Sequence, residues 1–164
     1  MLIRCLLSDQ LSLGVITPYQ AQRRAIVRDC QQNLKKEEEL MLLEKTVMIN
    51  TVDSFQGQEK DVIIVSTVRS NPRGNVGFLT DDRRINVALT RARFLLIVVG
   101  NGDTLGGNST WNDFLTWAEK MKVYYQISNP FAVKEVTEQF LKDFNQVPVN
   151  RKLYEEMTYD VRKK

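Results

Sequence analysis

Residues 47–66 read VMINTVDSFQGQEKDVIIVS, which places a polar block between two short apolar runs, Val47–Asn50 and Val62–Ser66. Each run is continuous rather than alternating in polarity, which is typical of strands buried on both faces of a parallel sheet. Two further runs of this kind occur at Leu13–Ile16 and Phe94–Val99. Longer helix-favouring stretches also occur, and this alternation predicts an α/β fold with a parallel sheet flanked by helices.

The spacing of apolar residues predicts three helices in the same part of the chain. The expected helices are Tyr19 to about Leu43 with an exposed turn or solvated face at Lys35–Glu39, Arg83–Arg93 with Ile85, Ala88, Leu89 and Ala92 buried, and Trp111–Met121 capped by Asn108, Ser109 or Thr110. Asp81 and Asp82 precede the second helix, where acidic side chains favour the positive end of the helix dipole. A last short strand is predicted at Val123–Ile127.

Length and composition fit a compact domain with an appendage. The chain has 164 residues, of which 43% are hydrophobic and 26% are charged, enough for one sizeable core. The pattern changes after Asn129, where an amphipathic stretch at Val133–Phe144 is followed by a mixed tail. We therefore assign residues 1–128 to one domain and residues 129–164 to a C-terminal helical extension.

Several classes of protein are excluded by what the chain lacks. It has no histidine, which excludes histidine-based triads, histidine zinc sites and imidazole proton shuttles. Two cysteines, Cys5 and Cys30, are too few for a disulfide framework and are predicted to be buried thiols of a reducing compartment. No apolar run reaches the roughly 18 residues of a membrane span. We expect a soluble intracellular protein of cytoplasm or nucleus, with no membrane partner.

A first candidate block for chemistry is ITPYQAQ at residues 16–22. The strand ends at the Thr17 hydroxyl and turns through Pro18 into a helix, whose free amides can hold a phosphate. The alternative is an ordinary helix start, because Thr-Pro is common there.

A second block, NTVDSFQGQEKD at residues 50–61, joins two buried strands. Gly57 permits close approach of the backbone, and Gln56 and Glu59 offer directed hydrogen bonds to a sugar or phosphate. The alternative is a solvated connector.

The third block, RRINVALTRAR at residues 83–93, holds four arginines within eleven residues. Guanidinium groups suit phosphate oxygens, and clustering them favours an anionic ligand. The alternative is a surface helix on which Arg84 and Arg91 pair with Asp81 and Asp82. The net charge of +3 does not decide between them.

Taken in order, these three blocks resemble the second RecA-like motor domain of superfamily 1 helicases. The group in question is typified by the nonsense-mediated-decay helicase, the Sen1 helicase and the Dna2 nuclease-helicase. The resemblance covers residues 12–127 with family-like spacing. It implies a RecA-like sheet of the P-loop NTPase type, and it implies roles for individual residues.

The implied roles concern ATP and a single nucleic-acid strand. Arg91 resembles the arginine finger, the catalytic residue that neutralises charge developing on the γ-phosphate. The implied ATP-binding residues are Gln56, Gly57, Glu59, Arg84 and Arg91. The implied nucleic-acid-binding residues are Thr17, Pro18, Tyr19, Thr51, Val52, Arg69 and Asn71. Contacts to the strand backbone predict sequence-independent, salt-sensitive binding.

Parts of a complete motor do not occur in the sequence. No G-x-x-x-x-G-K-[ST] loop is present, and residues 102–109 read as an ordinary strand-to-helix loop. No metal-binding residues are assigned. A Gln-Tyr-Arg-Met-His-Pro-type motif is also missing, so we expect the chain to begin inside the domain. The P-loop and the Mg²⁺ ligands for ATP would come from a first RecA-like domain of the same parent protein.

The sequence thus predicts the C-terminal motor lobe of an ATP-dependent RNA or DNA helicase, a lobe that does not hydrolyse ATP alone. One alternative is a catalytically silent module that binds a single strand or a protein. A third interpretation, an unrelated doubly wound nucleotide-binding domain, requires a phosphate loop after the first strand, and Thr17-Pro18-Tyr19 is not one.

Overall fold

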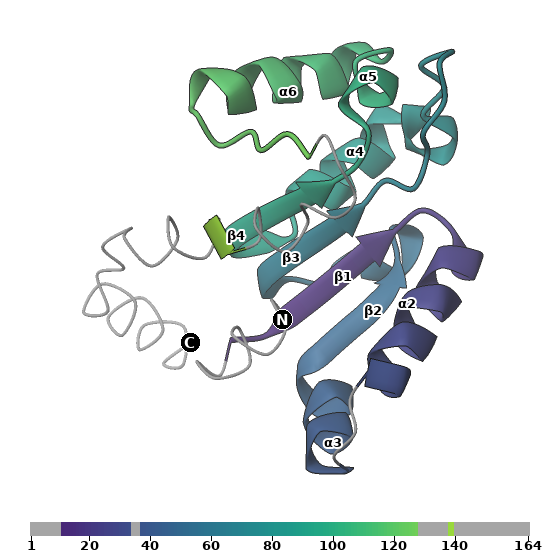
Figure 1. Ribbon diagram of the computed structural model, residues 1–164, viewed down its shortest axis with the longest axis vertical. Helices are drawn as coiled ribbons and strands as arrows, with labels where there is room; N and C mark the ends of the chain where they lie inside the picture. The colour runs from purple at the N-terminus through teal and green to yellow at the C-terminus, as the bar shows by residue number, and fades with distance from the viewer. Residues whose placement is uncertain (1–10, 34–36, 128–137, 140–164) are drawn as a thin grey trace. The chain divides into compact units, whose positions relative to one another are not determined.

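Four parallel strands form one sheet in the order β2-β1-β3-β4 (Figure 1). This computed structural model describes residues 11–33, 37–127 and 138–139. The strands are β1 (Leu13–Thr17), β2 (Val47–Thr51), β3 (Lys60–Ser66) and β4 (Ala92–Val99). The α/β class and the four long-run strands predicted from the sequence are therefore confirmed.

Helices connect and flank the strands. They are α2 (Gln20–Asn33), α3 (Glu37–Thr46), η1 (Asp53–Phe55), η2 (Gly77–Thr80), α4 (Asp82–Leu89), α5 (Gly102–Leu105) and α6 (Ser109–Lys120). The single helix predicted at Tyr19–Leu43 is wrong, because two helices, α2 and α3, occupy this stretch. Glu37–Glu39, predicted as part of a turn or solvated face, lie in the first turn of α3. None of the helices in the described part of the chain is long and apolar enough to cross a membrane.

The second predicted helix ends four residues early. At its C-terminus the Thr90 hydroxyl donates to the Asn86 carbonyl at 2.6 Å. The Arg91 carbonyl then accepts from the Lys60 amide of β3 at 3.1 Å, and β4 begins at Ala92. Arg91 and Arg93 therefore lie outside α4, because pairing with β3 takes over from the helix.

The third predicted helix is confirmed as α6, and the strand predicted after it is wrong. Asn108 caps α6, since its side chain accepts a hydrogen bond from the Trp111 amide at 3.1 Å. Lys122 follows with a φ of +59°. Residues 123–127 are then irregular and exposed, so they bury neither face as a sheet strand would. The predicted stretch at Val133–Phe144 lies outside the described residues except for 138 and 139.

The described residues up to Tyr124 form one compact unit, and Tyr125 begins a second. The core of the first unit is built from one sheet face, η1, η2, α4, α5 and α6. Its fully or almost fully buried members are Ile16, Val52, Phe55, Ile63, Val65, Val76, Leu79, Ile85, Ala88, Leu105 and Trp111. The indole N–H of Trp111 donates to the Leu79 carbonyl at 3.2 Å, which satisfies its polar atom inside the core.

The prediction that Cys30 is a buried thiol is wrong. It is half-exposed on α2, a helix in which no residue is fully buried, whereas Cys5 lies outside the described residues. Partial burial, and then the negative charge of Asp29, raise the pKa of the Cys30 thiol above its ordinary value. The thiol is therefore protonated at neutral pH and is a poor nucleophile.

Candidate functional site

The three motif blocks are distributed over two opposite edges of the sheet. The carboxyl edge is where β1, β2 and β3 end, at Thr17, Thr51 and Ser66. The amino edge is where β3 and β4 begin, at Lys60 and Ala92. The second block starts at the carboxyl edge and ends at the amino edge, since β2 and β3 run parallel. The predicted site residues consequently fall into two groups.

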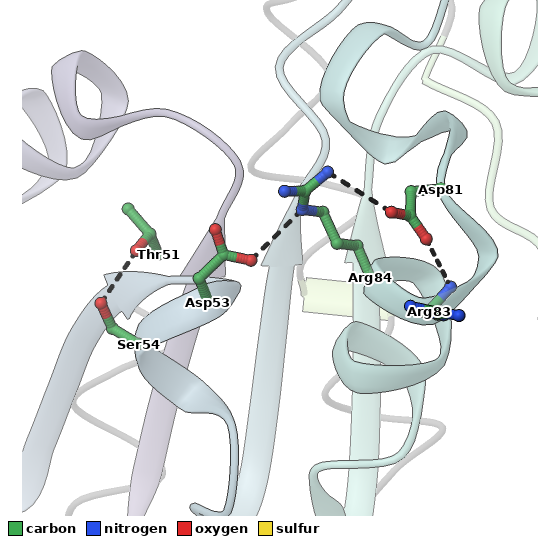
Figure 2. A network of polar contacts seen from close by, with 6 residues as sticks. All are labelled: Thr51, Asp53, Ser54, Asp81, Arg83 and Arg84. Carbon is green, nitrogen blue, oxygen red and sulfur yellow. Dashed lines mark hydrogen bonds and ion pairs between the residues drawn. The ribbon is translucent and has the colours of Figure 1, made fainter.

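Thr17 and Thr51 lie side by side at the carboxyl edge. They are register partners of β1 and β2, and the Val52 amide donates to the Thr17 carbonyl at 3.2 Å. The Thr51 hydroxyl is 3.0 Å from the Ser54 hydroxyl (Figure 2). The Thr17 hydroxyl is buried and has no partner among the described residues. Thr17 has 0% of its surface exposed, so a ligand could use this unpaired hydroxyl only by displacing the groups that enclose it.

Tyr19 and Arg69 extend this group, although fifty positions separate them. The Arg69 Nε donates to the Tyr19 hydroxyl at 3.0 Å, and its guanidinium carbon lies 5.7 Å from the centre of the tyrosine ring. The Phe78 amide also donates to this hydroxyl, at 3.4 Å. The fold thus joins the turn after β1 to the loop after β3.

Besides Thr17, two predicted nucleic-acid-binding residues have buried side chains. Val52 belongs to the core, with 0% of its surface exposed, and Pro18 is also buried. Their side chains are not placed to touch a strand. Any contribution to binding must come from their backbone or from the shape that they give to the edge.

Arg84, which is predicted to bind ATP, has its observed partners near the carboxyl edge. Its Nε lies 3.2 Å from Asp53 and its Nη1 lies 3.5 Å from Asp81, so the side chain reaches between two acids (Figure 2). The guanidinium also stacks 3.8 Å from the centre of the Phe78 ring. The alternative to an anionic ligand is a surface helix whose arginines pair with Asp81 and Asp82. For Arg84, the pairing with Asp81 is present. Phe78 and Asp53 were not singled out from sequence, because nothing local marks their contacts.

At the amino edge, Gln56, Gly57 and Glu59 lead into β3. Gly57 has a φ of +77°, a backbone conformation that favours glycine. Apart from its chain neighbours, no described residue lies within 4 Å of where its Cβ would be. Glu59 is exposed, and its carboxylate lies 3.6 Å from Arg93 Nε. This segment therefore presents an open turn and an accessible carboxylate.

Arg91 immediately precedes β4, as Glu59 immediately precedes β3. Lys60 and Ala92 are register partners, so Glu59 and Arg91 occupy equivalent positions on neighbouring strands. Arg91 Nη2 donates to the Thr90 hydroxyl at 2.7 Å, and its Nε is buried without a partner among the described residues. A buried guanidinium nitrogen with an unused donor is a fitting contact for an anion.

Arg93 is a charged residue whose place sequence reasoning missed. It lies within 3.7 Å of Asp61, whose side chain also accepts hydrogen bonds from the Ser12 amide and hydroxyl. Arg93 thereby connects Glu59 to a structural carboxylate at the start of β3. In the part of the chain that the structure describes, no group of three acids or cysteines could hold a metal ion.

Comparison with known families decides the assignment. A family model described as an AAA domain matches residues 2–103. The chain belongs to this AAA-domain family. The matched residues contain all three motif blocks, and several relatives are named as helicases. The predicted membership in the superfamily 1 group of the nonsense-mediated-decay helicase is thereby confirmed, so the AAA domain is a helicase domain.

Three relatives illustrate the match. The chain is 49% identical over 104 residues to "Regulator of nonsense transcripts 1" of Dictyostelium discoideum, covering 63% of this chain and 8% of that protein. It is 46% identical over 103 residues to "ATP-dependent helicase NAM7" of Saccharomyces cerevisiae, covering 63% and 10%. It is 39% identical over 124 residues to "Probable helicase MAGATAMA 3" of Arabidopsis thaliana, covering 76% and 14%. The chain thus spans 14% or less of the length of these relatives.

Proposed function

We propose that this chain is the second motor lobe of an ATP-dependent helicase and supplies one side of a shared ATP site. The observation that carries the proposal is the equivalent placement of Glu59 and Arg91 at the starts of two neighbouring strands. The strand-contacting candidates lie at the opposite edge. One lobe thus has separate surfaces for a nucleotide and for a nucleic-acid strand.

At the amino edge, the residues fit the sugar and γ-phosphate side of a nucleotide. The free donor of Arg91 suits a phosphate oxygen, and the open turn at Gly57 leaves space beside the Glu59 carboxylate, which suits ribose hydroxyls. ATP with Mg²⁺, when bound, supplies the phosphoryl group that water attacks. Arg91 contributes positive charge where negative charge develops in that reaction. The P-loop and Mg²⁺ ligands belong to a first RecA-like domain.

At the carboxyl edge, Thr17, Thr51, Tyr19 and Arg69 are proposed to hold the sugar-phosphate backbone of RNA or DNA. Hydroxyl and guanidinium donors bind phosphate oxygens without reading bases. Helix α4 links the two edges, because Arg84 in its first turns pairs with Asp53 and Arg91 follows its last turn. Closure of the ATP cleft can therefore move the strand-holding edge, which is the basis of translocation, 5′ to 3′ by the resemblance.

We expect the 164-residue chain to release no phosphate from ATP above background, with or without single-stranded RNA or DNA. Half of an active site lacks the P-loop that orients the phosphates. The measurement is phosphate release at saturating ATP, with Arg91→Ala as the control. Turnover that disappears in the Arg91→Ala chain would contradict the shared-site proposal.

The double variant Thr17→Ala/Thr51→Ala is expected to weaken single-strand binding by about tenfold, since each lost hydroxyl contact costs on the order of 0.5–1 kcal/mol. The loss should be equal for oligonucleotides of different sequence, because the contacts are to the backbone. Fluorescence anisotropy with oligo(U) and a mixed-sequence RNA measures it. Thr116→Ala, an exposed threonine on α6, is the matched control. Loss for one sequence only would exclude backbone gripping.

A further inference from the structure

The loop that follows β3 carries positive charge without compensating acids. Between Asp61 and Asp81 the sequence has no aspartate or glutamate, but it has Arg69 and Arg73. Arg73 is exposed, and its guanidinium forms no ion pair with the described residues. The carboxyl edge is therefore extended by a locally basic surface.

This surface is hollowed. A solvent-open pocket of about 300 Å³ is lined by Arg69, Asn71, Pro72, Arg73 and Asn75. Two arginines and two asparagines are among its lining residues, and Arg69 also contacts Tyr19. The Asn71 side chain is already bonded to Asn75. The exposed guanidinium of Arg73 is therefore the group best placed to meet a phosphate oxygen.

Thr104 holds the pocket loop in place from outside the motif blocks. Its buried hydroxyl accepts from the Asn71 amide at 2.8 Å and donates to the Asn71 carbonyl at 3.0 Å. The Asn71 side chain in turn bonds the Asn75 amide and carbonyl, at 3.1 and 2.9 Å. Both polar groups of the Asn71 backbone and the far end of the loop are therefore fixed before any ligand arrives.

Two glycines bring the same loop against the turn between α5 and α6. Gly74 has a φ of +62°, and a Cβ added to Gly107 would lie only 2.5 Å from the Gly74 carbonyl oxygen. This contact, like the Thr104 bonds, restricts the loop. A loop that is already ordered loses little conformational entropy when it binds.

We propose that this pocket binds a backbone phosphate of the single strand, with Arg73 as its direct contact and Thr104 as the positioning residue of the loop. The inference rests on the proposed function of the carboxyl edge and extends it. The strand would pass from Thr17 and Thr51 over Tyr19 and Arg69 to the pocket. Arg73 adds a contact that lies outside all three motif blocks.

The first test measures binding of a fluorescein-labelled oligo(U) to the full chain between 50 and 300 mM KCl, a range chosen so that counterion release is visible. Arg73→Gln is expected to weaken binding roughly three- to tenfold at the lowest salt and to reduce the salt slope by about 0.7, the contribution of one phosphate contact on a single strand. Arg28→Gln, an exposed arginine on α2, changes the net charge equally and should leave the slope unchanged. Equal slopes for the two variants would overturn the inference.

The second test concerns Thr104. Thr104→Val keeps the shape but removes the hydroxyl, and it is expected to reproduce much of the Arg73→Gln slope change, whereas Thr104→Ser should restore normal binding. Adding Arg73→Gln to Thr104→Val should cost little more, because both changes remove the same contact. Thermal unfolding identifies loss of the fold, in which case Arg73→Gln alone decides.

Competition by inorganic phosphate and the Thr17→Ala/Thr51→Ala variant distinguish failure of the phosphate pocket from failure of the proposed function. Inorganic phosphate at millimolar concentration should compete only weakly; tight, Arg73-dependent binding of free phosphate with unchanged oligo(U) binding would overturn the assignment to a strand. If Thr17→Ala/Thr51→Ala leaves oligo(U) binding intact, the proposed carboxyl-edge function fails. If that double variant weakens binding and Arg73→Gln does not, the phosphate pocket alone fails.

Discussion

Replacing Arg91 with alanine is expected to reduce ATP turnover by about 10³- to 10⁵-fold in a protein that joins this chain to a P-loop motor domain. Arg91 lies just before β4 with a buried Nε that has no partner among the described residues. Its loss removes charge stabilisation that matters most in the transition state, so kcat falls more than ATP affinity does. Steady-state hydrolysis and nucleotide titration together measure the two effects.

Matched variants make the Arg91 test specific. Arg91→Lys keeps the positive charge but loses the planar guanidinium fork, so it should restore only a small part of the turnover. Arg28→Ala removes one exposed arginine of α2 and should leave kcat within about twofold. An Arg91→Ala protein that hydrolyses ATP at nearly the parent rate would show that Arg91 is not the arginine finger.

The strands could be predicted because each is a continuous apolar run. Val62–Ser66 lies in the central strand β3, in which Val62, Ile63 and Val65 are buried. Phe94–Val99 lies in the edge strand β4, in which no residue is fully buried, so its expected burial on both faces is wrong. The observed β3 and β4 begin two residues before the predicted runs. Periodicity also found the buried side of α4, since Ile85 and Ala88 are fully buried. These features depend on residues that are close together in the sequence, so they can be predicted from the sequence alone.

The end of α4 could not be predicted, because two periodicities overlap there. Ala92 lies at the helical spacing from Ile85 and Ala88, yet it is also the first residue of a strand that packs on the same core. The Thr90 hydroxyl closes the helix, and the Lys60 amide pairs with the Arg91 carbonyl. Pairing with β3, which is distant in sequence, therefore decides whether this segment continues α4 or begins β4.

The grouping of the site residues depends on contacts far apart in sequence. The resemblance implies that Arg84 binds ATP, and its partners within the chain are Asp53, Asp81 and Phe78. Arg84 lies within the first turn of α4 and Arg91 lies beyond its last, about 10 Å further along. A shared block in sequence can therefore serve both edges of the sheet.

Phe55→Ala is expected to lower the free energy of unfolding of the chain by about 3–5 kcal/mol, which corresponds to a fall in Tm of roughly 10 °C. Phe55 stands inside the second motif block, yet 0% of its surface is exposed. Its ring lies against β1 so closely that a Cβ on Gly14 would come within 2.9 Å of it. The role of Phe55 in the motif block is thus to pack in the core, and removal of its ring leaves a cavity under the sheet. Urea and thermal unfolding measure the effect.

Gln58→Ala separates this packing role from a binding role. Gln58 is exposed in the same block, so its truncation should change the free energy of unfolding by less than about 0.5 kcal/mol. Below its lowered Tm, folded Phe55→Ala should still bind oligo(U), because the ring is enclosed by the core and cannot touch a strand. A Phe55→Ala chain with unchanged Tm and lost binding would reverse this interpretation, since it would make the aromatic side chain a ligand contact rather than a support for the edge.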